Sequence, residues 1–140
     1  MIKNIFFAAI ALSLSACSEK LNVDTFKGTF TGKFYYQPPS ESKIVSADAE
    51  VSFSDSRYSS KGNTGYVPAG GSGTFAIHDQ IVDFKDENIW TANFDWGLIL
   101  QGKYTYQVKG DSLILNRYSE PCVNCSAAPG TYQYRLKRSN

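Results

Sequence analysis

The chain has 140 residues, with 14 basic and 13 acidic side chains and a formal net charge of +1 at pH 7. A near-neutral chain whose longest basic run is the pair Lys137–Arg138 lacks the positive surface that nucleic-acid binding requires, so we expect no nucleic-acid partner. The length suits one domain, and after residue 16 no apolar stretch approaches the roughly 18 residues of a membrane helix.

The first 16 residues have the pattern of a secretory signal peptide. Lys3 supplies the positive start, the apolar run of residues 5–14 follows, and small residues lead up to Cys17. The apolar run is too short to span a bilayer. We therefore expect a signal peptide over residues 1–16, a polar tether over 17–25 and a folded domain over 26–140.

The end of this signal resembles the lipobox of bacterial lipoproteins, here Leu14-Ser15-Ala16-Cys17. The resemblance implies that the Cys17 thiol takes a diacylglycerol, that the preceding segment is removed, and that the new amino terminus is acylated, for example with palmitate. Several acyl chains would anchor the protein stably in a membrane of the cell envelope. Ser18 after the cysteine resembles the sorting pattern for the outer membrane. An ordinary secreted protein with an incidental Cys17 is the alternative.

Alternation of apolar and polar residues with a period of two dominates the remaining sequence. This pattern predicts strands with one buried face, over residues 26–36, 47–54, 57–61, 73–78, 80–84, 98–109, 112–118 and 132–137. Because no convincing helix of ten residues interrupts them, we expect an all-β fold. The predicted architecture is an antiparallel meander of about eight strands closed into a barrel, since closure removes both unpaired edges.

Three segments interrupt the alternation. Residues 59–73 are rich in glycine and serine, which predicts a mobile loop that could act as a lid. Residues 89–96 hold two tryptophans and a phenylalanine among polar residues, and we expect them to close one end of the barrel. Residues 119–130 contain two prolines and the two remaining cysteines, and form a predicted long hairpin loop.

Cys122 and Cys125 form an even pair in an exported protein, which favours a structural disulfide. A redox role would need a nearby cation or a helix N-terminus to stabilise a thiolate, and the sequence indicates neither. A zinc site would need about four ligands, but His78 is the only histidine. A thiol or metal sensor at this pair remains an alternative to the disulfide.

Several short motifs carry a family resemblance. They are Gly28-Thr29-Phe30 and Gly32-Lys33-Phe34 in the first strand, Gly102-Lys103-Tyr104-Thr105-Tyr106 and Gly110-Asp111-Ser112-Leu113 in the later strands, and the closing Tyr134-Arg135-Leu136. Over residues 26–138 the chain resembles the lipocalin-like lipoproteins of bacterial envelopes, members of the calycin group. The resemblance implies a barrel whose interior holds packed side chains or one small ligand.

The polar residues give little support to catalysis. His78 and Asp79 are adjacent in the chain, so in a strand they would point to opposite faces and could not orient one another. The acidic cluster Asp83, Asp86 and Glu87 lacks the ligand spacing of a calcium loop. We therefore expect no enzyme, no resident cofactor and no metal site.

Aromatic residues on the inward face of the predicted strands form the candidate ligand site: Phe34, Tyr36, Phe53, Tyr104, Tyr106, Tyr132 and Tyr134. Buried tyrosine hydroxyls need partners, so they either bond to one another in a solid barrel or face a cavity with a ligand. Two functions follow: a membrane-anchored module that binds a small apolar ligand, or an envelope protein–protein module such as an inhibitor or assembly factor. The contacts of the second would be Trp90, Tyr66 and the loop around Val123.

Overall fold

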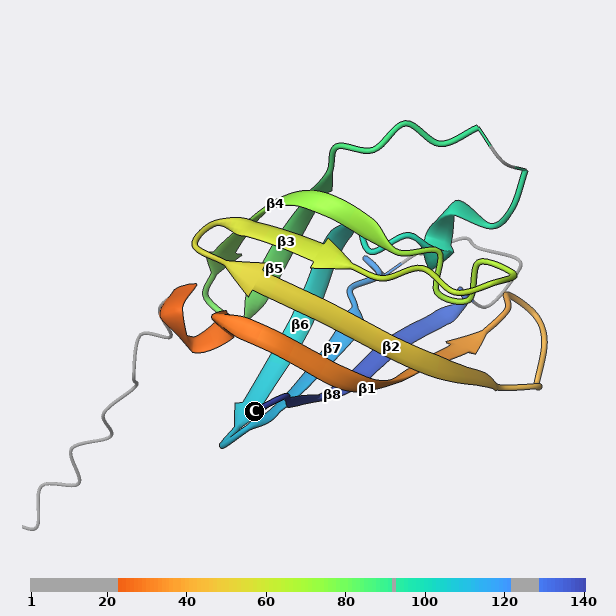
Figure 1. Cartoon of the computed structure of the whole chain (residues 1–140). Helices are drawn as coiled ribbons and strands as arrows, with labels where there is room; N and C mark the ends of the chain where they lie inside the picture. Colours follow the sequence, from red (N-terminus) through yellow and green to blue (C-terminus); the bar gives the residue numbers. More distant parts are fainter. Residues whose placement is uncertain (1–22, 92, 122–128) are drawn as a thin grey trace, which may run out of the picture.

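The computed structural model describes residues 23–91, 93–121 and 129–140 (Figure 1). These residues form eight antiparallel strands in which each strand pairs with its neighbours in sequence and β8 pairs with β1. The strands are β1 (Gly28–Gln37), β2 (Val45–Ser54), β3 (Arg57–Ser60), β4 (Gly71–His78), β5 (Ile81–Asp86), β6 (Gly102–Lys109), β7 (Ser112–Arg117) and β8 (Thr131–Arg138), with two 3-10 helices, η1 (Val23–Phe26) and η2 (Trp96–Leu98). The predicted all-β closed barrel is confirmed.

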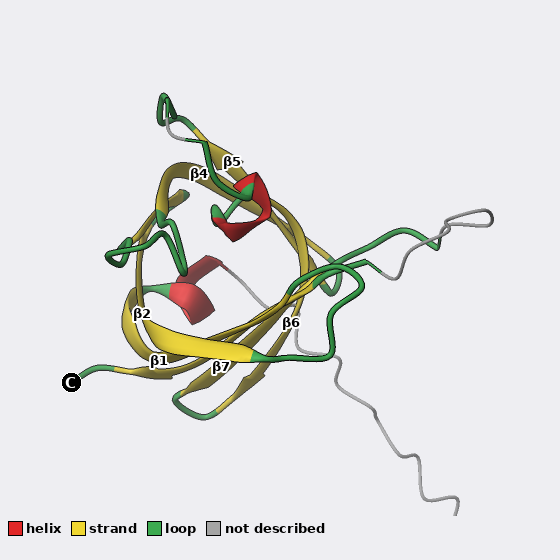
Figure 2. Cartoon of the chain, turned by 90° about the vertical axis from the view of Figure 1, so that its right-hand side faces the viewer, coloured by secondary structure: helices red, strands yellow, loops and turns green. Residues whose placement is uncertain are grey.

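The two ends of the barrel differ in their connections. At the turn end, η1 leads into β1, and tight turns at residues 55–56, 79–80 and 110–111 join strand pairs. Positive φ angles at Asp55, Asp79 and Gly110 open these turns, a conformation that Asp and Gly tolerate. At the loop end lie the longer connections 38–44, 61–70 and 87–101, together with the connection from β7 to β8. Figure 2 looks onto the loop end, where η2 lies over the ring of strands.

Phe26 closes the turn end from inside. Its ring is fully buried and meets Phe53 and Tyr106 edge to face, with ring centroids 5.3 and 5.2 Å apart. The prediction of a strand from residue 26 was wrong here, because Phe26 belongs to η1 and β1 begins at Gly28. Phe26 and Phe30 are separated by an even number of positions, as expected for two residues on one face of a strand. The Phe26 ring, however, fills the end of the barrel, whereas Phe30 belongs to the wall.

Residues 98–100 close the loop end. The Ala69 N–H donates to Leu98 O over 3.0 Å and the Leu100 N–H donates to Gly70 O over 2.8 Å, so this segment pairs with the β3–β4 loop. The predicted strand from residue 98 was wrong, since β6 begins at Gly102. Leu98, Ile99 and Leu100 are all buried, as expected for a segment that crosses the mouth rather than following the wall. We call residues 95–100 the mouth plug.

The remaining strand boundaries differ by a few residues. β4 begins at Gly71 rather than Gly73 because Gly71 and Ser72 pair with β3. β5 extends to Asp86, which pairs with Gly73. No helix among the described residues is both long and apolar enough to cross a membrane.

Candidate functional site

Asp95 organises a polar cluster at the loop end. One carboxylate oxygen accepts hydrogen bonds from the Tyr36 hydroxyl at 2.8 Å and the Tyr132 hydroxyl at 3.0 Å. The other oxygen accepts from the Gly97 N–H at 2.8 Å, so Asp95 caps the first turn of η2. The carboxylate therefore fastens the mouth plug to β1 and β8.

Arg117 completes this cluster from β7. Its guanidinium donates to Gly97 O over 2.7 Å and lies 4.9 Å from the centre of the Tyr132 ring. Gly97 is required by the close approach of that ring, because a Cβ there would come within 2.5 Å of the Tyr132 hydroxyl oxygen. We call Tyr36, Asp95, Gly97, Arg117 and Tyr132 the Asp95 cluster.

The cluster shifts the pKa values of its own members. Partial burial acts to raise the pKa of Asp95, but hydrogen bonds from Tyr36, Gly97 and Tyr132 and the charge of Arg117 outweigh it, so the pKa lies below its ordinary value. Burial, together with the hydrogen bond to Asp95, raises the pKa of Tyr132 to about 12. The charged carboxylate is thus the form that the cluster stabilises.

A second carboxylate, Asp86, shapes the segment before the mouth plug. It accepts from the Trp90 indole N–H at 2.6 Å, from the Ser72 N–H at 2.9 Å and from the Asn88 amide at 2.9 Å. Trp90 meets Phe94 edge to face at 5.7 Å. These contacts hold Asn88 and Trp90 beside the start of β4 and connect Trp90 with Phe94.

The acidic cluster of Asp83, Asp86 and Glu87 is spread over different partners. Asp86 serves the hydrogen bonds above, while Glu87 forms an ion pair with Arg57 at 2.7 Å. Across the described part of the chain, no group of three or more His, Cys, Asp or Glu side chains is placed to hold a metal ion. His78 and Asp79 lie exposed at the turn between β4 and β5.

Large apolar side chains that remain exposed gather at the loop end. Phe94 stacks on Tyr66 of the β3–β4 loop, with ring centroids 4.6 Å apart and planes at 3°. The exposed fractions of the set run from 41% to 93%. Its members, which we call the apolar rim, are Ile44, Tyr66, Ile89, Trp96 and Tyr118. Every one lies in a connection at this end, and together they represent all the exposed large hydrophobic residues found among the described ones.

Trp90, predicted as a surface contact, is only half-exposed and is tied to Asp86 and Phe94. Ile89 and Trp96 are more accessible, at 93% and 53%. Tyr66 is exposed, as the protein-contact hypothesis requires. Val123 lies outside the described residues, as do Cys17, Cys122 and Cys125, so the lipidation and the disulfide remain predictions.

The predicted ligand-site residues divide between the core and the rim of the barrel. Five of them are buried in the interior: Phe34, Phe53, Tyr104, Tyr106 and Tyr134. Tyr36 and Tyr132 lie half-buried at the mouth, in the Asp95 cluster. Ring contacts connect the buried set, for example Phe34 with Tyr134 at 4.6 Å.

The hydroxyl groups in the interior differ in their hydrogen bonding. Tyr58 donates to Leu100 O over 2.6 Å, and Tyr106 donates to Asp79 O over 2.8 Å. The buried hydroxyls of Tyr104, Tyr134 and Ser60 make no well-formed hydrogen bond with a described residue, although the Ser60 hydroxyl lies near enough to Tyr134 to act on the pKa of its phenol. Burial raises the pKa of Tyr134 well above its ordinary value, so this phenol is neutral. Tyrosine-to-tyrosine hydrogen bonding, one of the two expected arrangements, does not account for these three groups.

Two hollows of about 450 and 480 Å³ lie on the outer wall of the barrel. The first is lined by charged residues that include Lys33, Asp48 and Lys61, and the second by Asp83, Lys85 and others. Open, charged hollows differ from the concave apolar pockets that bind drug-sized ligands.

Comparison with known proteins gives no indication of the function. No family model, no curated protein and no solved structure matches this chain.

Sequence reasoning missed Asp95 and Arg117. The signal for Asp95 is its position before Trp96 and Gly97, since an aspartate before a short turn is a common cap. Nothing local indicates its partners, because Tyr36 is 59 positions away and Tyr132 is 37 positions away.

Proposed function

We propose that this protein is a lipid-anchored lipoprotein of the bacterial envelope whose barrel presents its loop end to another envelope protein. The observation that supports the proposal is the apolar rim. All five of its side chains lie in connections at one end of the barrel, none at the other. Concentrated exposed apolar surface marks interaction sites on soluble domains.

The position of the anchor supports this orientation. Cys17 precedes Val23, the first residue of η1, by six positions, so the covalent chain holds the lipid within about 20 Å of the turn end. The turn end would then face the membrane, and the loop end would point away from it. The outer membrane, suggested by Ser18, is part of the proposal.

Protein binding at the apolar rim is better supported than binding of a small apolar ligand inside the barrel. The interior is occupied by buried rings in mutual contact, such as Phe53 with Phe75 at 5.3 Å and Phe84 with Tyr104 at 5.7 Å. The exposed set is rich in tryptophan and tyrosine, which are enriched at protein interfaces. A lipocalin-like ancestry agrees with the barrel and belongs to the same proposal.

The test compares capture of partner proteins by the wild type and by Ile89→Ser combined with Trp96→Ala. Both side chains are exposed, so we expect the fold to persist and capture to fall at least tenfold. Ile114→Ser is the matched control, because Ile114 lies on the outer wall in β7, away from the loop end. Equal capture by the two variants, with the same melting temperature, would remove the apolar rim from the interface.

A second candidate function is binding of a small ligand in the loop-end half of the interior. The observation in its favour is that the buried hydroxyls of Ser60, Tyr104 and Tyr134 make no well-formed hydrogen bond with a described residue. Hydroxyls of this kind need polar partners, so such a ligand would carry hydrogen-bonding atoms rather than be purely apolar. Native mass spectrometry of the purified protein tests this candidate by revealing a retained small molecule.

A further inference from the structure

Charged residues are distributed unevenly over the wall of the barrel, although the chain as a whole is nearly neutral. β1, β6, β7 and β8 with the β6–β7 turn contain seven Lys or Arg residues and a single acid, Asp111. Residues 45–86, which span β2 to β5 with their connections, contain six acids and three Lys or Arg residues. One half of the wall is therefore basic and the other half acidic.

Strand register gathers the basic side chains on the outer face. Lys109 pairs with Ser112, and Ser112 pairs with Lys137, so the two lysines lie in one row across three strands. Arg135 lies on the same face, two positions before Lys137 in β8, because alternate residues of a strand share a face. Lys109, Arg135 and Lys137 are exposed and form no ion pair with any described residue. We call these three residues the basic flank.

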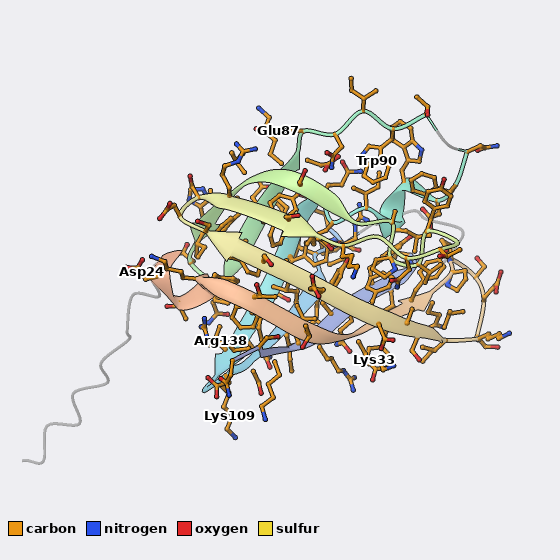
Figure 3. All side chains as sticks on the ribbon, viewed as in Figure 1. Asp24, Lys33, Glu87, Trp90, Lys109 and Arg138 are labelled. Atoms are coloured by element: carbon orange, nitrogen blue, oxygen red, sulfur yellow. The ribbon has the colours of Figure 1, made fainter. Side chains whose placement is uncertain are left out.

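The basic flank adjoins the point where the chain enters the barrel. Lys137 pairs with Thr31 of β1. Beside it, the Arg138 guanidinium donates to Lys27 O and, over 2.9 Å, to Thr25 O in η1. Figure 3 shows Lys109 and Arg138 together near the turn end, on the side of the barrel opposite Glu87. The segment that leads back to Cys17 therefore starts beside the basic flank.

We propose that the basic flank docks on the anionic headgroups of the membrane that holds the lipid anchor. This proposal goes beyond the interaction at the loop end. It rests on the proposed lipid anchor in one respect: the anchor brings the basic flank close to the membrane. Each Lys or Arg beside an anionic bilayer strengthens binding about fivefold. The acidic half of the wall would be repelled, so the barrel would stand on its turn end and tilt, with the turn-end part of β6 to β8 toward the lipid and β2 to β5 away from it.

The test uses the mature chain, residues 17–140, with Cys17→Ser to remove the lipid. Co-sedimentation with vesicles of phosphatidylglycerol and phosphatidylcholine is compared with vesicles of phosphatidylcholine alone. We expect binding only to the anionic vesicles, loss of binding at 0.5 M salt because screening weakens exposed charges, and a loss of about 25-fold on combining Lys109→Ala with Lys137→Ala. Lys61→Ala with Lys85→Ala, on the acidic half, is the matched control and should not weaken binding.

Three results would overturn the proposal: no binding to anionic vesicles, equal binding to neutral vesicles, or equal losses in the two double variants. A different partner for the flank is the acidic half of a second copy. Salt-sensitive dimers without lipid, abolished by the Lys109 and Lys137 changes, would show that partner instead. Failure here leaves partner capture through Ile89 and Trp96 unaffected, so the two proposals fail separately.

Discussion

The Tyr132 hydroxyl donates a hydrogen bond to the Asp95 carboxylate over 3.0 Å and so joins the last strand to the segment that crosses the barrel mouth. Tyr36 donates to the same oxygen from the first strand over 2.8 Å. Since β1 and β8 form the seam that closes the barrel, Asp95 fastens the mouth plug on that seam. Asp95 is therefore the side chain that joins the mouth plug to both strands of the seam.

Replacing Asp95 with alanine should destabilise the protein by about 1 to 2 kcal/mol. The change removes the cap of η2 and leaves two tyrosine hydroxyls and one backbone N–H without their acceptor. Urea unfolding followed by tryptophan fluorescence measures the loss. Asp48→Ala removes an exposed carboxylate that pairs with Lys33 and should have little effect. If both variants unfold alike, Asp95 does not hold the mouth plug.

Acid should loosen the loop end. The pKa of Asp95 is depressed in the folded protein, so its stabilising effect is complete above the unfolded-state pKa of about 3.9 and is lost as the pH falls through the lower folded value. We expect the amides of Gly97 and Leu98 to lose protection from hydrogen exchange below about pH 4, after correction for the intrinsic rate. In Asp95→Asn this pH dependence should disappear. A dependence that persists in that variant would assign it to another group.

The interior tyrosines should respond differently to loss of their hydroxyls. Tyr58→Phe leaves the buried Leu100 carbonyl without its donor and should cost about 1 to 2 kcal/mol. Tyr134→Phe removes a buried hydroxyl that makes no well-formed hydrogen bond with a described residue, and should be neutral or stabilising by about 1 kcal/mol. Chemical denaturation of the two variants provides the comparison. A cost for Tyr134→Phe as large as that for Tyr58→Phe would show that the Tyr134 hydroxyl has a hydrogen-bond partner, either Ser60 or a bound molecule.

Lipidation predicts the behaviour of Cys17→Ser in cells. The variant should lack lipid and leave the membrane fraction during a high-salt wash, because the wash screens the remaining attraction between charged groups and headgroups. Fractionation and immunoblotting measure this, with Cys122→Ser as the control that keeps Cys17. Recovery of Cys17→Ser in washed membranes at the wild-type level would refute the anchor.

The barrel was predictable from sequence because its signal is local. In residues 28–37 and 45–54, neighbouring side chains alternate between core and solvent, and the strands observed there differ from the predicted ones by two residues or fewer at each end. Closure of the barrel was also predictable. A sheet of eight short consecutive strands has two unpaired edge strands, and pairing the first strand with the last removes both edges.

The two ends of the barrel were not predictable in the same way. Phe26 and Leu98 fit an alternating pattern, but each lies in a segment that turns across an opening instead of following the wall. The Asp95 cluster combines residues from β1, β7 and β8 with the β5–β6 connection, and only the closed barrel brings them together. Similarly, the basic flank depends on strand register, which the overall charge of the chain does not reveal.

The central claim is that the loop end, and not the turn end, contacts another envelope protein, and site-specific photocrosslinking in cells tests it most directly. A photoreactive amino acid is placed singly at Ile89 or Trp96 at the loop end, and at Asp55 or Asp79 at the turn end. The account predicts a discrete adduct with one protein from both loop-end positions and none from the turn-end positions. Adducts from Asp55 or Asp79 alone, or none from any position in protein that fractionates with membranes, would contradict it.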